Sequence, residues 1–213
     1  MKIAVDAMGG DNAPREIVKG ALAASREING DIILVGDREQ LEQFGPLPKN
    51  VSIVHSTEII SNEEKPTIAL RKKKEASISV ATRLVRDGEA DAVVSAGSTG
   101  AQMAAALLML GRLPNIHRPA IVAILPGITS PKVLLDAGAN TDCKPENLLE
   151  FAVMGSIYAR TVMGIKDPLV GLLNIGSEAG KGNSLTLEAY ELLKNADINF
   201  YGNIEAREIP GSE

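Results

Sequence analysis

The chain has 213 residues and a formal net charge of −5, and it is 45% hydrophobic and 23% charged. This composition is typical of a soluble globular protein, and the acidic balance argues against a general nucleic-acid surface. The single cysteine, Cys143, excludes an internal disulfide framework and suits a reducing cytosol. No stretch approaches the about 18 uninterrupted apolar residues of a membrane span, so we expect no membrane-crossing helix.

Apolar, β-branched runs alternate along the chain with segments of helical period. Strands are expected at 2–7, 31–36, 51–55, 91–96, 120–125, 132–137, 169–175 and 198–202. Helices are expected at 14–28, 67–88, 100–111, 145–164 and 185–195, with Pro14 and Pro145 in the first turns of two of them. Nearly continuous apolar strands separated by helices predict a mainly parallel sheet covered on both faces.

Two of the expected strands depart from this alternation. The runs 120–125 and 132–137 are joined by the short segment PGITSP, which predicts a hairpin or an excursion at the edge of the sheet. No repeat, low-complexity tract or linker interrupts the chain. We therefore expect residues 1–213 to form a single α/β domain.

Glycine-rich turns follow four of the strands. They read MGGDNAP after 2–7, AGSTGA after 91–96, AGANTDCKP after 132–137 and GSEAGKGNS after 169–175. In a parallel α/β sheet these turns share one edge, where glycines let backbone N–H groups approach a ligand and helix N-termini favour an anion. The alternative is that one or two of the turns are simply tight connections.

The turn that contains Lys181 is not a nucleotide-binding P-loop. Only three residues separate Gly176 from Gly180, and Gly182 stands where the magnesium-binding hydroxyl would be. The first turn also lacks the Gly-x-Gly-x-x-Gly pattern of dinucleotide sites. A lysine in a glycine-rich turn still suits a smaller anion such as free phosphate.

Five blocks of the sequence resemble one known family. IAVDAMGGDNAP, KPTIALRKKKEAS, VSAGSTGA, LLDAGANTDCKPENLLEFAVMGS and VGLLNIGSEAGKGN are similar, in this order, to the phosphate acyltransferases of bacterial phospholipid synthesis, the PlsX family. The resemblance implies transfer of a fatty acyl group from acyl carrier protein to inorganic phosphate, which gives acyl phosphate. It also implies an α/β/α sandwich like that of isocitrate and isopropylmalate dehydrogenases, and no metal or other cofactor.

The resemblance carries expectations about assembly and location as well. It implies a cytoplasmic homodimer with sites near the interface, peripheral contact with the inner face of the cell membrane and a downstream membrane acyltransferase as partner. Family members continue past Glu213 with a further strand, an Asp-Gly-rich turn and a membrane-linked helical segment. The chain is therefore expected to be the N-terminal two-thirds of a longer protein.

Two positions depart from the family pattern. The acidic run before the lysine is reduced to Glu178, and Ser98 stands where the family often has asparagine. Lys181 is the expected catalytic cation, which binds phosphate or the oxyanion; the alternative is a solvated loop lysine. Asn174 and Glu178 are expected to orient it.

The remaining candidates bind substrate or serve as ordinary helix caps. Asp11 and Asn12 either cap the first helix or face the site, and Ser98 and Thr99 either cap the helix at 100–111 or donate hydroxyls. The expected substrate-binding set is Gly9, Gly10, Asp11, Asn12, Gly97, Ser98, Thr99, Gly100, Asn140, Asp142, Gly176 and Gly182.

The run RKKKEAS concentrates positive charge in an acidic chain. It is either a solvated helix face or a patch that steers the acidic acyl carrier protein to the site. The resemblance favours a docking role for Lys65, Arg71, Lys72 and Lys73. Cys143 is expected to be inert, because neither histidine lies in a recognisable Cys/His arrangement.

Three other functions are the alternatives, and the sequence disfavours the second of them. One is a phosphotransacetylase-like exchange that uses coenzyme A. A second, a metal-dependent dehydrogenase, would need a cluster of carboxylates that the sequence does not show. The third is a module that binds the carrier protein or a metabolite without turnover.

Overall fold

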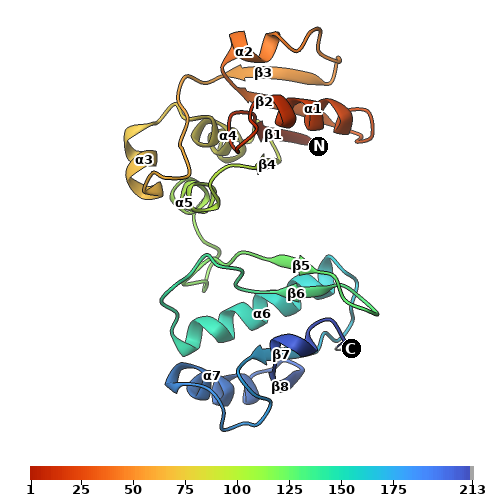
Figure 1. Ribbon diagram of the computed structural model, residues 1–213, viewed down its shortest axis with the longest axis vertical. Coiled ribbons are helices and arrows are strands. Elements are labelled where there is room, and N and C mark those ends of the chain that lie inside the picture. The colour runs from red at the N-terminus through yellow and green to blue at the C-terminus, as the bar shows by residue number, and fades with distance from the viewer. Residues whose placement is uncertain (212–213) are drawn as a thin grey trace. The chain divides into compact units, whose positions relative to one another are not determined.

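Four short apolar runs in the first half of the chain form one parallel sheet. They are β1 (Lys2–Asp6), β2 (Asp31–Gly36), β3 (Val51–His55) and β4 (Ala92–Ser95), in the order β3-β2-β1-β4 (Figure 1). β1 and β2 are the central strands, and apart from Asp6 at the end of β1 their buried residues are apolar on both faces, as a covered parallel sheet requires. The structure is a computed structural model and describes residues 1–211.

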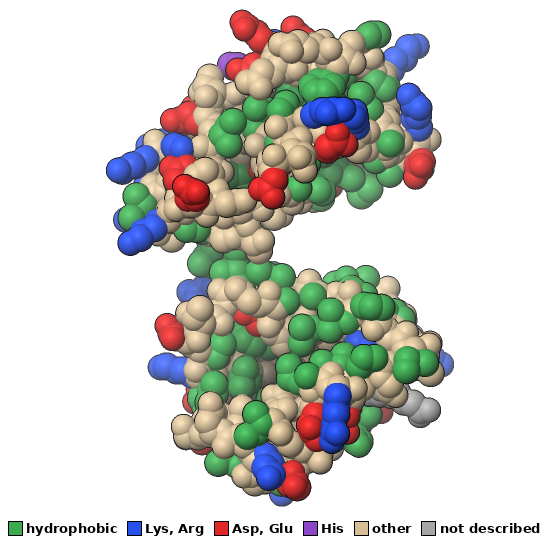
Figure 2. Space-filling model, in the orientation of Figure 1, with side chains coloured by type: hydrophobic (Ala, Val, Ile, Leu, Met, Phe, Trp, Pro, Cys, Tyr) green, Lys and Arg blue, Asp and Glu red, His purple; other side chains and the backbone are tan. Residues whose placement is uncertain are grey.

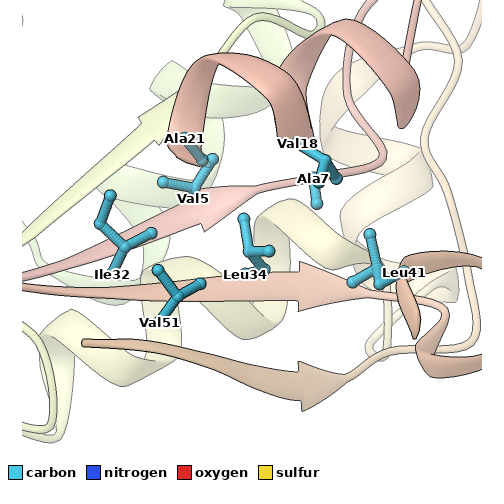
Figure 3. Close-up of a cluster of buried hydrophobic side chains, with 8 residues drawn as sticks. All are labelled: Val5, Ala7, Val18, Ala21, Ile32, Leu34, Leu41 and Val51. Carbon is cyan, nitrogen blue, oxygen red and sulfur yellow. The ribbon is translucent and has the colours of Figure 1, made fainter. Parts of the chain in front are cut away.

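Helices cover both faces of this sheet. Val5 and Leu34 point toward α1 (Arg15–Ala24), and Figure 3 shows the cluster that they form with side chains of α1 and β3. The alternate residues Ala4 and Val35 pack with α4 (Ser77–Arg86) on the opposite face. The period-two alternation of strand side chains therefore produces three layers in this part of the chain.

Three further helices complete the first half. α2 (Arg38–Glu42) is a single short turn that Asp37 caps through its side chain. α3 (Pro66–Lys72) and α5 (Thr99–Met109) pack with α4 in a cluster rich in alanine. The small alanine side chains let these helices approach closely beside the end of the sheet.

The second half contains a hairpin and a βαβ unit. β5 (Ala123–Leu125) and β6 (Lys132–Leu134) pair antiparallel, which confirms the predicted hairpin. The long helix α6 (Pro145–Thr161) precedes β7 (Val170–Leu173), α7 (Ser184–Lys194) and β8 (Phe200–Ile204), and β7 pairs parallel with β8. A 3₁₀ turn, Ala206–Glu208, follows β8.

The chain divides into two compact units, Met1–Arg112 and Leu113–Glu213. Every strand predicted from the sequence is present, and a mainly parallel α/β fold is confirmed. Within residues 1–211 the strands belong to three separate sheets instead of one. The single-domain organisation stays a prediction, and each unit is described by itself below.

The predicted helix at 67–88 is wrong, because two helices occupy this segment. α3 ends at Lys72 and α4 begins at Ser77, and the residues between them pair with another part of the backbone. The Glu58 N–H donates to the Glu75 carbonyl, and the Ser77 N–H donates to the Glu58 carbonyl. These bonds replace the helical ones and interrupt the helix.

Proline fits both helix starts, but in different places. Pro145 is the first residue of α6, as expected, whereas Pro14 precedes α1 as its N-cap residue. No helix among residues 1–211 has both the length and the apolar content that crossing a membrane requires.

Candidate functional site

The chain order of the first sheet reverses between β1 and β4. From β1 the chain adds β2 and β3 on one side, and it then crosses to place β4 on the other side of β1. Ligands of open α/β sheets bind at such a switch point, outside the carboxyl ends of the strands. Two of the predicted glycine-rich turns, those that begin after Asp6 and after Ser95, lie at this place.

The last residues of β1 and β4 are joined by a hydrogen bond. The Ser95 hydroxyl donates to Asp6 Oδ2 over 2.7 Å, and the same Ser95 Oγ accepts from the Gly97 N–H over 3.0 Å. Asp6 Oδ1 accepts from the Met8 N–H at 3.3 Å, and the Asp6 residue is only 2% exposed. A buried carboxylate thus ties together the starts of both turns.

The glycines of these turns pack against each other. A Cβ at Gly97 would lie 3.0 Å from Gly9 Cα, and a Cβ at Gly9 would lie 2.3 Å from Asp6 Oδ2. Gly10 has φ +112°, and a Cβ there would lie 2.8 Å from the Ala96 carbonyl oxygen. The glycines therefore allow close contact between the two turns, a role that the sequence did not indicate.

A small cavity lies beside this contact. Its volume is about 10 Å³, and its polar lining comes from Asp6, Ser77, Ser95, Gly97 and Ser98. A cavity of this size holds about one water molecule. It is too small for phosphate, so a substrate of that size would contact the outer side of the turns.

The helix starts next to the turns settle the capping alternatives. Ser98 is the N-cap of α5, and its Oγ accepts from the Ala101 N–H over 3.3 Å. Thr99 opens α5, and a Cβ at Gly100 would lie 3.0 Å from Cγ of Pro66 in α3. The alternative that Asp11 or Asn12 caps α1 is wrong, because Pro14 holds that position without a side-chain cap.

Asp11 instead lies on the exposed surface of the first turn. Its Oδ1 accepts from the Asn62 side-chain amide over 3.4 Å. Asn12 contributes its backbone carbonyl, which accepts from the Glu16 N–H over 3.1 Å. Substrate binding by the side chains of Asp11 and Asn12 therefore stays a prediction.

The basic run falls on and after α3. Figure 2 shows Lys and Arg side chains, interspersed with acidic ones, over the part of the first unit where α3 lies. The side chain of Lys73 is held in place, because its Nζ donates to the Ile59 carbonyl and to Glu64 Oε2, both over 2.7 Å. Lys65 is the N-cap residue of α3, and Arg71 and Lys72 are exposed in its last turn.

In the second unit, two asparagine side chains build the Lys181 turn. Asn174 directly follows β7, and Asn203 lies in the adjacent strand β8, where it is 2% exposed. Asn174 Nδ2 donates to Asn203 Oδ1 and to the Lys181 carbonyl, each over 3.1 Å. Asn203 Nδ2 donates to the Glu178 carbonyl over 2.8 Å, so the pair holds the turn at two points.

Lys181 itself is half exposed. Its Nζ lies 3.8 Å from Glu178 Oε1, and its side chain is 50% exposed. An exposed pair at this distance contributes little to stability, so the ammonium group can exchange Glu178 for an incoming anion. Asn174 orients the backbone of Lys181, whereas Glu178 is the group that faces its charge.

Glycine is required next to Lys181. Gly182 has φ +102°, and a Cβ there would lie 1.9 Å from Thr186 Oγ1 and 2.7 Å from Asn174 Oδ1. Gly176 lies against the side chain of Lys181, at 3.0 Å from a built Cβ to Cγ. Asn183 then caps α7 by accepting from the Thr186 N–H over 3.1 Å. The turn is thus a compact, side-chain-braced start of a helix.

An open hollow of about 540 Å³ borders this turn. Its lining is Leu173, Asn174, Ile175, Gly182, Asn183, Thr186 and Ala206. Ile175 is 81% exposed, and it gives the hollow an apolar side next to the polar turn. An apolar group and an anion could therefore be held side by side here.

The turn after β6 uses its polar residues on its own backbone. Asp136 Oδ1 accepts from the Ile121 N–H, and Asp136 Oδ2 accepts from the Asn140 N–H over 2.7 Å. Asn140 Nδ2 also donates to the Pro119 carbonyl over 2.9 Å. The alternative that Asn140 or Asp142 caps α6 is wrong, because Lys144 is the N-cap residue and its N–H donates to Asn147 Oδ1.

Cys143 is partly buried in this same turn. Burial raises the pKa of its thiol, and the nearby Asp136 and Asp142 add to this against the opposing effect of Arg118. A thiol with a raised pKa is a poor nucleophile at neutral pH. This environment fits the expectation of an inert cysteine.

Comparison with known proteins decides the family. The model of a family described as fatty acid synthesis protein matches residues 1–213. The chain belongs to this family. Its relatives include proteins named phosphate acyltransferase from Moorella thermoacetica, 61% identical over 98% of this chain, and from Desulfitobacterium hafniense, 58% identical over 99% of it. The chain spans 62% and 64% of the length of these two curated relatives.

Solved structures show a similar fold at low identity. The EutD phosphotransacetylase from Staphylococcus aureus has a TM-score of 0.64 at 20% identity, covering 96% of this chain and 68% of its own. A branched-chain phosphotransacylase from Enterococcus faecalis V583 has a TM-score of 0.65 at 18% identity, covering 100% of this chain and 71% of its own.

The structure of this fatty acid synthesis family member groups the predicted residues within each unit. In the first unit it brings together Gly9, Gly10, Gly97, Ser98 and Gly100. In the second it brings together Asn174, Gly176, Glu178, Lys181 and Gly182. Four residues that hold these turns are not predicted from the sequence, namely Asp6, Ser95, Asn203 and Asp136. A polar residue that ends an apolar strand was the available signal for the first two.

Proposed function

We propose that the protein, as part of a longer chain, transfers a fatty acyl group from acyl carrier protein to inorganic phosphate and so forms acyl phosphate for phospholipid synthesis. The observation that carries this proposal is the match of all 213 residues to the family, together with 61% identity to a protein named phosphate acyltransferase. Phosphate attacks the thioester carbonyl, the C–S bond breaks, and the carrier thiolate leaves.

This reaction requires that the reactants are positioned and that the negative charge of the oxyanion is stabilised. Phosphate is already a competent nucleophile. The carrier thiol has a pKa of about 8.5, so its thiolate leaves without a strong general acid. Most of the acceleration can therefore come from holding the reactants in line and stabilising the oxyanion. Lys181 supplies the cation, and Asn174 and Asn203 fix the turn that carries it.

The remaining site residues keep supporting roles in the proposal. The first unit's turns, with Gly9 to Asn12 and Gly97 to Gly100, contact substrate on their outer side. The apolar side of the hollow near Lys181, with Leu173 and Ile175, suits an acyl chain. Lys65, Arg71 and Lys72 dock the acidic carrier protein, whereas Lys73 fixes the loop after β3 through Glu64.

Assembly and location belong to the proposal as well. We infer a cytoplasmic homodimer that makes peripheral contact with the membrane, where a membrane acyltransferase takes up the acyl phosphate. We also infer that the longer protein has the layered arrangement of isocitrate and isopropylmalate dehydrogenases. Sedimentation of the longer protein and its flotation with anionic vesicles test the first two points.

A coenzyme A-dependent exchange is the second candidate function. The fold likeness to two phosphotransacylases favours it. Acyl phosphate formation is measured with acyl carrier protein and with coenzyme A as the acyl donor, at equal donor concentrations. The proposal expects a clear preference for the carrier-protein donor, and a preference for coenzyme A would contradict it.

Replacing Lys181 tests the catalytic assignment. Lys181→Ala removes the cation, and we expect kcat/KM to fall on the order of 100- to 1000-fold, as for loss of one oxyanion-stabilising group. Lys166→Ala, an exposed lysine elsewhere in the same unit, is the matched control and should keep full activity. Equal rates for the two variants would show that Lys181 is not part of the catalytic site. A wild-type protein without turnover would favour a binding module.

A further inference from the structure

Asp6 is a buried carboxylate that the proposed mechanism does not use. Within residues 1–211 its hydrogen-bond partners are the Ser95 hydroxyl and the Met8 N–H, and no lysine or arginine is among them. A buried carboxylate without an ion pair depends on its hydrogen bonds for stabilisation. Asp6 is held in this state at the switch point of the sheet, between the two glycine turns.

In this conformation of the turns, the space beside Asp6 is too small for a substrate. The cavity beside Asp6 has a volume of about 10 Å³, which admits about one water molecule. Gly9 covers the carboxylate closely, since even a Cβ at that residue would lie 2.3 Å from Oδ2. Any effect of Asp6 on the reaction must therefore pass through the turns.

The directions of the hydrogen bonds show how Asp6 acts on both turns. A hydroxyl has one proton to donate, and the proton of Ser95 is committed to Asp6 Oδ2. The lone pairs of Ser95 Oγ are then available to the Gly97 N–H. Asp6 in this way fixes the first turn through Met8 and the second turn through Ser95.

We infer that Asp6 and Ser95 are positioning residues, which lock the Gly9–Gly10 turn and the Gly97–Ser98 turn into one rigid surface for the substrate. The inference rests on the proposed function for its catalytic consequence. The locking itself does not depend on which substrate binds.

Two variants remove parts of this arrangement with little change in volume. Ser95→Ala deletes the hydroxyl and leaves the Gly97 N–H without its acceptor. Asp6→Asn turns one acceptor oxygen into an N–H donor, so either the Met8 N–H or the Ser95 hydroxyl proton loses its acceptor. Ser95→Thr keeps the hydroxyl and is the conservative variant that should restore function.

The matched control lies at the opposite edge of the same sheet. Asn50 Nδ2 donates to the Ser25 carbonyl over 2.8 Å and to the Gly30 carbonyl over 3.1 Å. Asn50→Ala therefore also removes two hydrogen bonds that connect segments of this unit. It does so far along the strands from the glycine turns.

The first measurement is amide hydrogen exchange, followed by NMR under conditions where every variant is folded. We expect the Gly97 amide to exchange on the order of tenfold faster in Ser95→Ala, and the Met8 or Gly97 amide to do so in Asp6→Asn. Asn50→Ala should leave both amides unchanged. Unchanged exchange at Gly97 in Ser95→Ala would overturn the inference.

The second measurement is the steady-state rate of acyl phosphate formation. We expect kcat to fall on the order of 10- to 100-fold in Asp6→Asn and Ser95→Ala, with recovery in Ser95→Thr. An equal fall of kcat in Asn50→Ala would show that Asp6 and Ser95 act only through the general stability of the unit, and it would overturn the inference. If the longer wild-type protein forms no acyl phosphate, the proposed function fails, and the exchange experiment alone decides whether the turns are locked.

Discussion

Buried polar side chains at strand ends hold the turns of both units. Asp6 and Asn203 are each 2% exposed, and each binds the backbone of a turn at the carboxyl end of its sheet. Burying such a group is costly unless its hydrogen bonds are made, so each side chain strongly favours one conformation of its turn. At this scale the candidate site is defined by backbone shape as much as by charge.

A pH-dependent contact is predicted at Glu150 in α6. Its carboxylate accepts from the His117 N–H over 3.0 Å and contacts His117 Nδ1, and its side chain is 14% exposed. Burial raises the pKa of Glu150, but the hydrogen bonds from His117 outweigh this and lower it. Because the folded-state pKa lies below the unfolded one, the stabilisation is full above the ordinary glutamate pKa, about 4.3, and is lost as the pH falls through the lower value.

The free energy of unfolding of wild type and Glu150→Gln, measured by urea denaturation, checks this sign. The difference between them should be fully present above a pH of about 4.3 and should shrink as the pH falls below it. Glu188→Gln, an exposed carboxylate of α7, should show no such dependence. A difference for Glu150→Gln that grows in acid would contradict the assignment.

The residues that the sequence did not reveal share one property. Asp6 ends an apolar run, and two glycines come only three residues later, so it is easily taken for part of a turn. Asn203 lies inside a strand whose pattern gives no reason for a buried amide. Their roles depend on partners 89 and 29 residues away, Ser95 and Asn174, which local patterns do not contain.

Among the elements, the connection from β7 to α7 leaves little room for a side chain at Gly182. Gly182 has φ +102° and no room for a Cβ, so Gly182→Ala forces a rearrangement of Thr186 or Asn174. We expect it to destabilise the second unit by about 1–3 kcal/mol in urea denaturation. Gly180→Ala is the matched control in the same turn, because nothing lies within 4 Å of its built Cβ, and it should change stability by less than about 0.5 kcal/mol. Similar losses for both variants would show that the turn is not braced as described.

Element type was predictable from the sequence where the apolar period was strong. The strands at 31–36 and 51–55 match their predicted bounds, because their apolar runs are flanked by polar residues. The break between α3 and α4 was not predictable, since the segment from Lys73 to Ala76 consists of good helix formers. Backbone pairing with Glu58 overrides that propensity. α2, with five residues, is too short for a period to appear.

At the scale of the whole molecule, the first unit contains its own core. The clusters of α1, α4 and the sheet, and of α3 with α5, consist only of residues before Arg112. The second unit has a smaller cluster around Leu172, Ala189 and Leu193. It also exposes apolar side chains such as Ile128 and Ile175. Figure 2 shows hydrophobic side chains, in green, on the surface of this unit.

We therefore expect residues 1–112 to fold when expressed alone. Circular dichroism should show a cooperative thermal transition, and NMR should show dispersed amide signals. The fragment 1–88, which lacks β4 and α5, is the control and should lose the cooperative transition. A fragment 1–112 without cooperative unfolding would show that its core needs the second unit.

The hydrogen bond between Asp6 and Ser95 connects residues that are 89 positions apart. Closing a loop of this length has an entropic cost that the contacts between β1 and β4 must offset, so we expect the bond to form only when these two strands pair. On the ribosome, the first turn emerges long before its partner, and it has to wait for β4 to leave the exit tunnel. A chain released before that moment contains β1 and the turn after it but lacks β4, so it cannot form the surface that the two glycine turns build together.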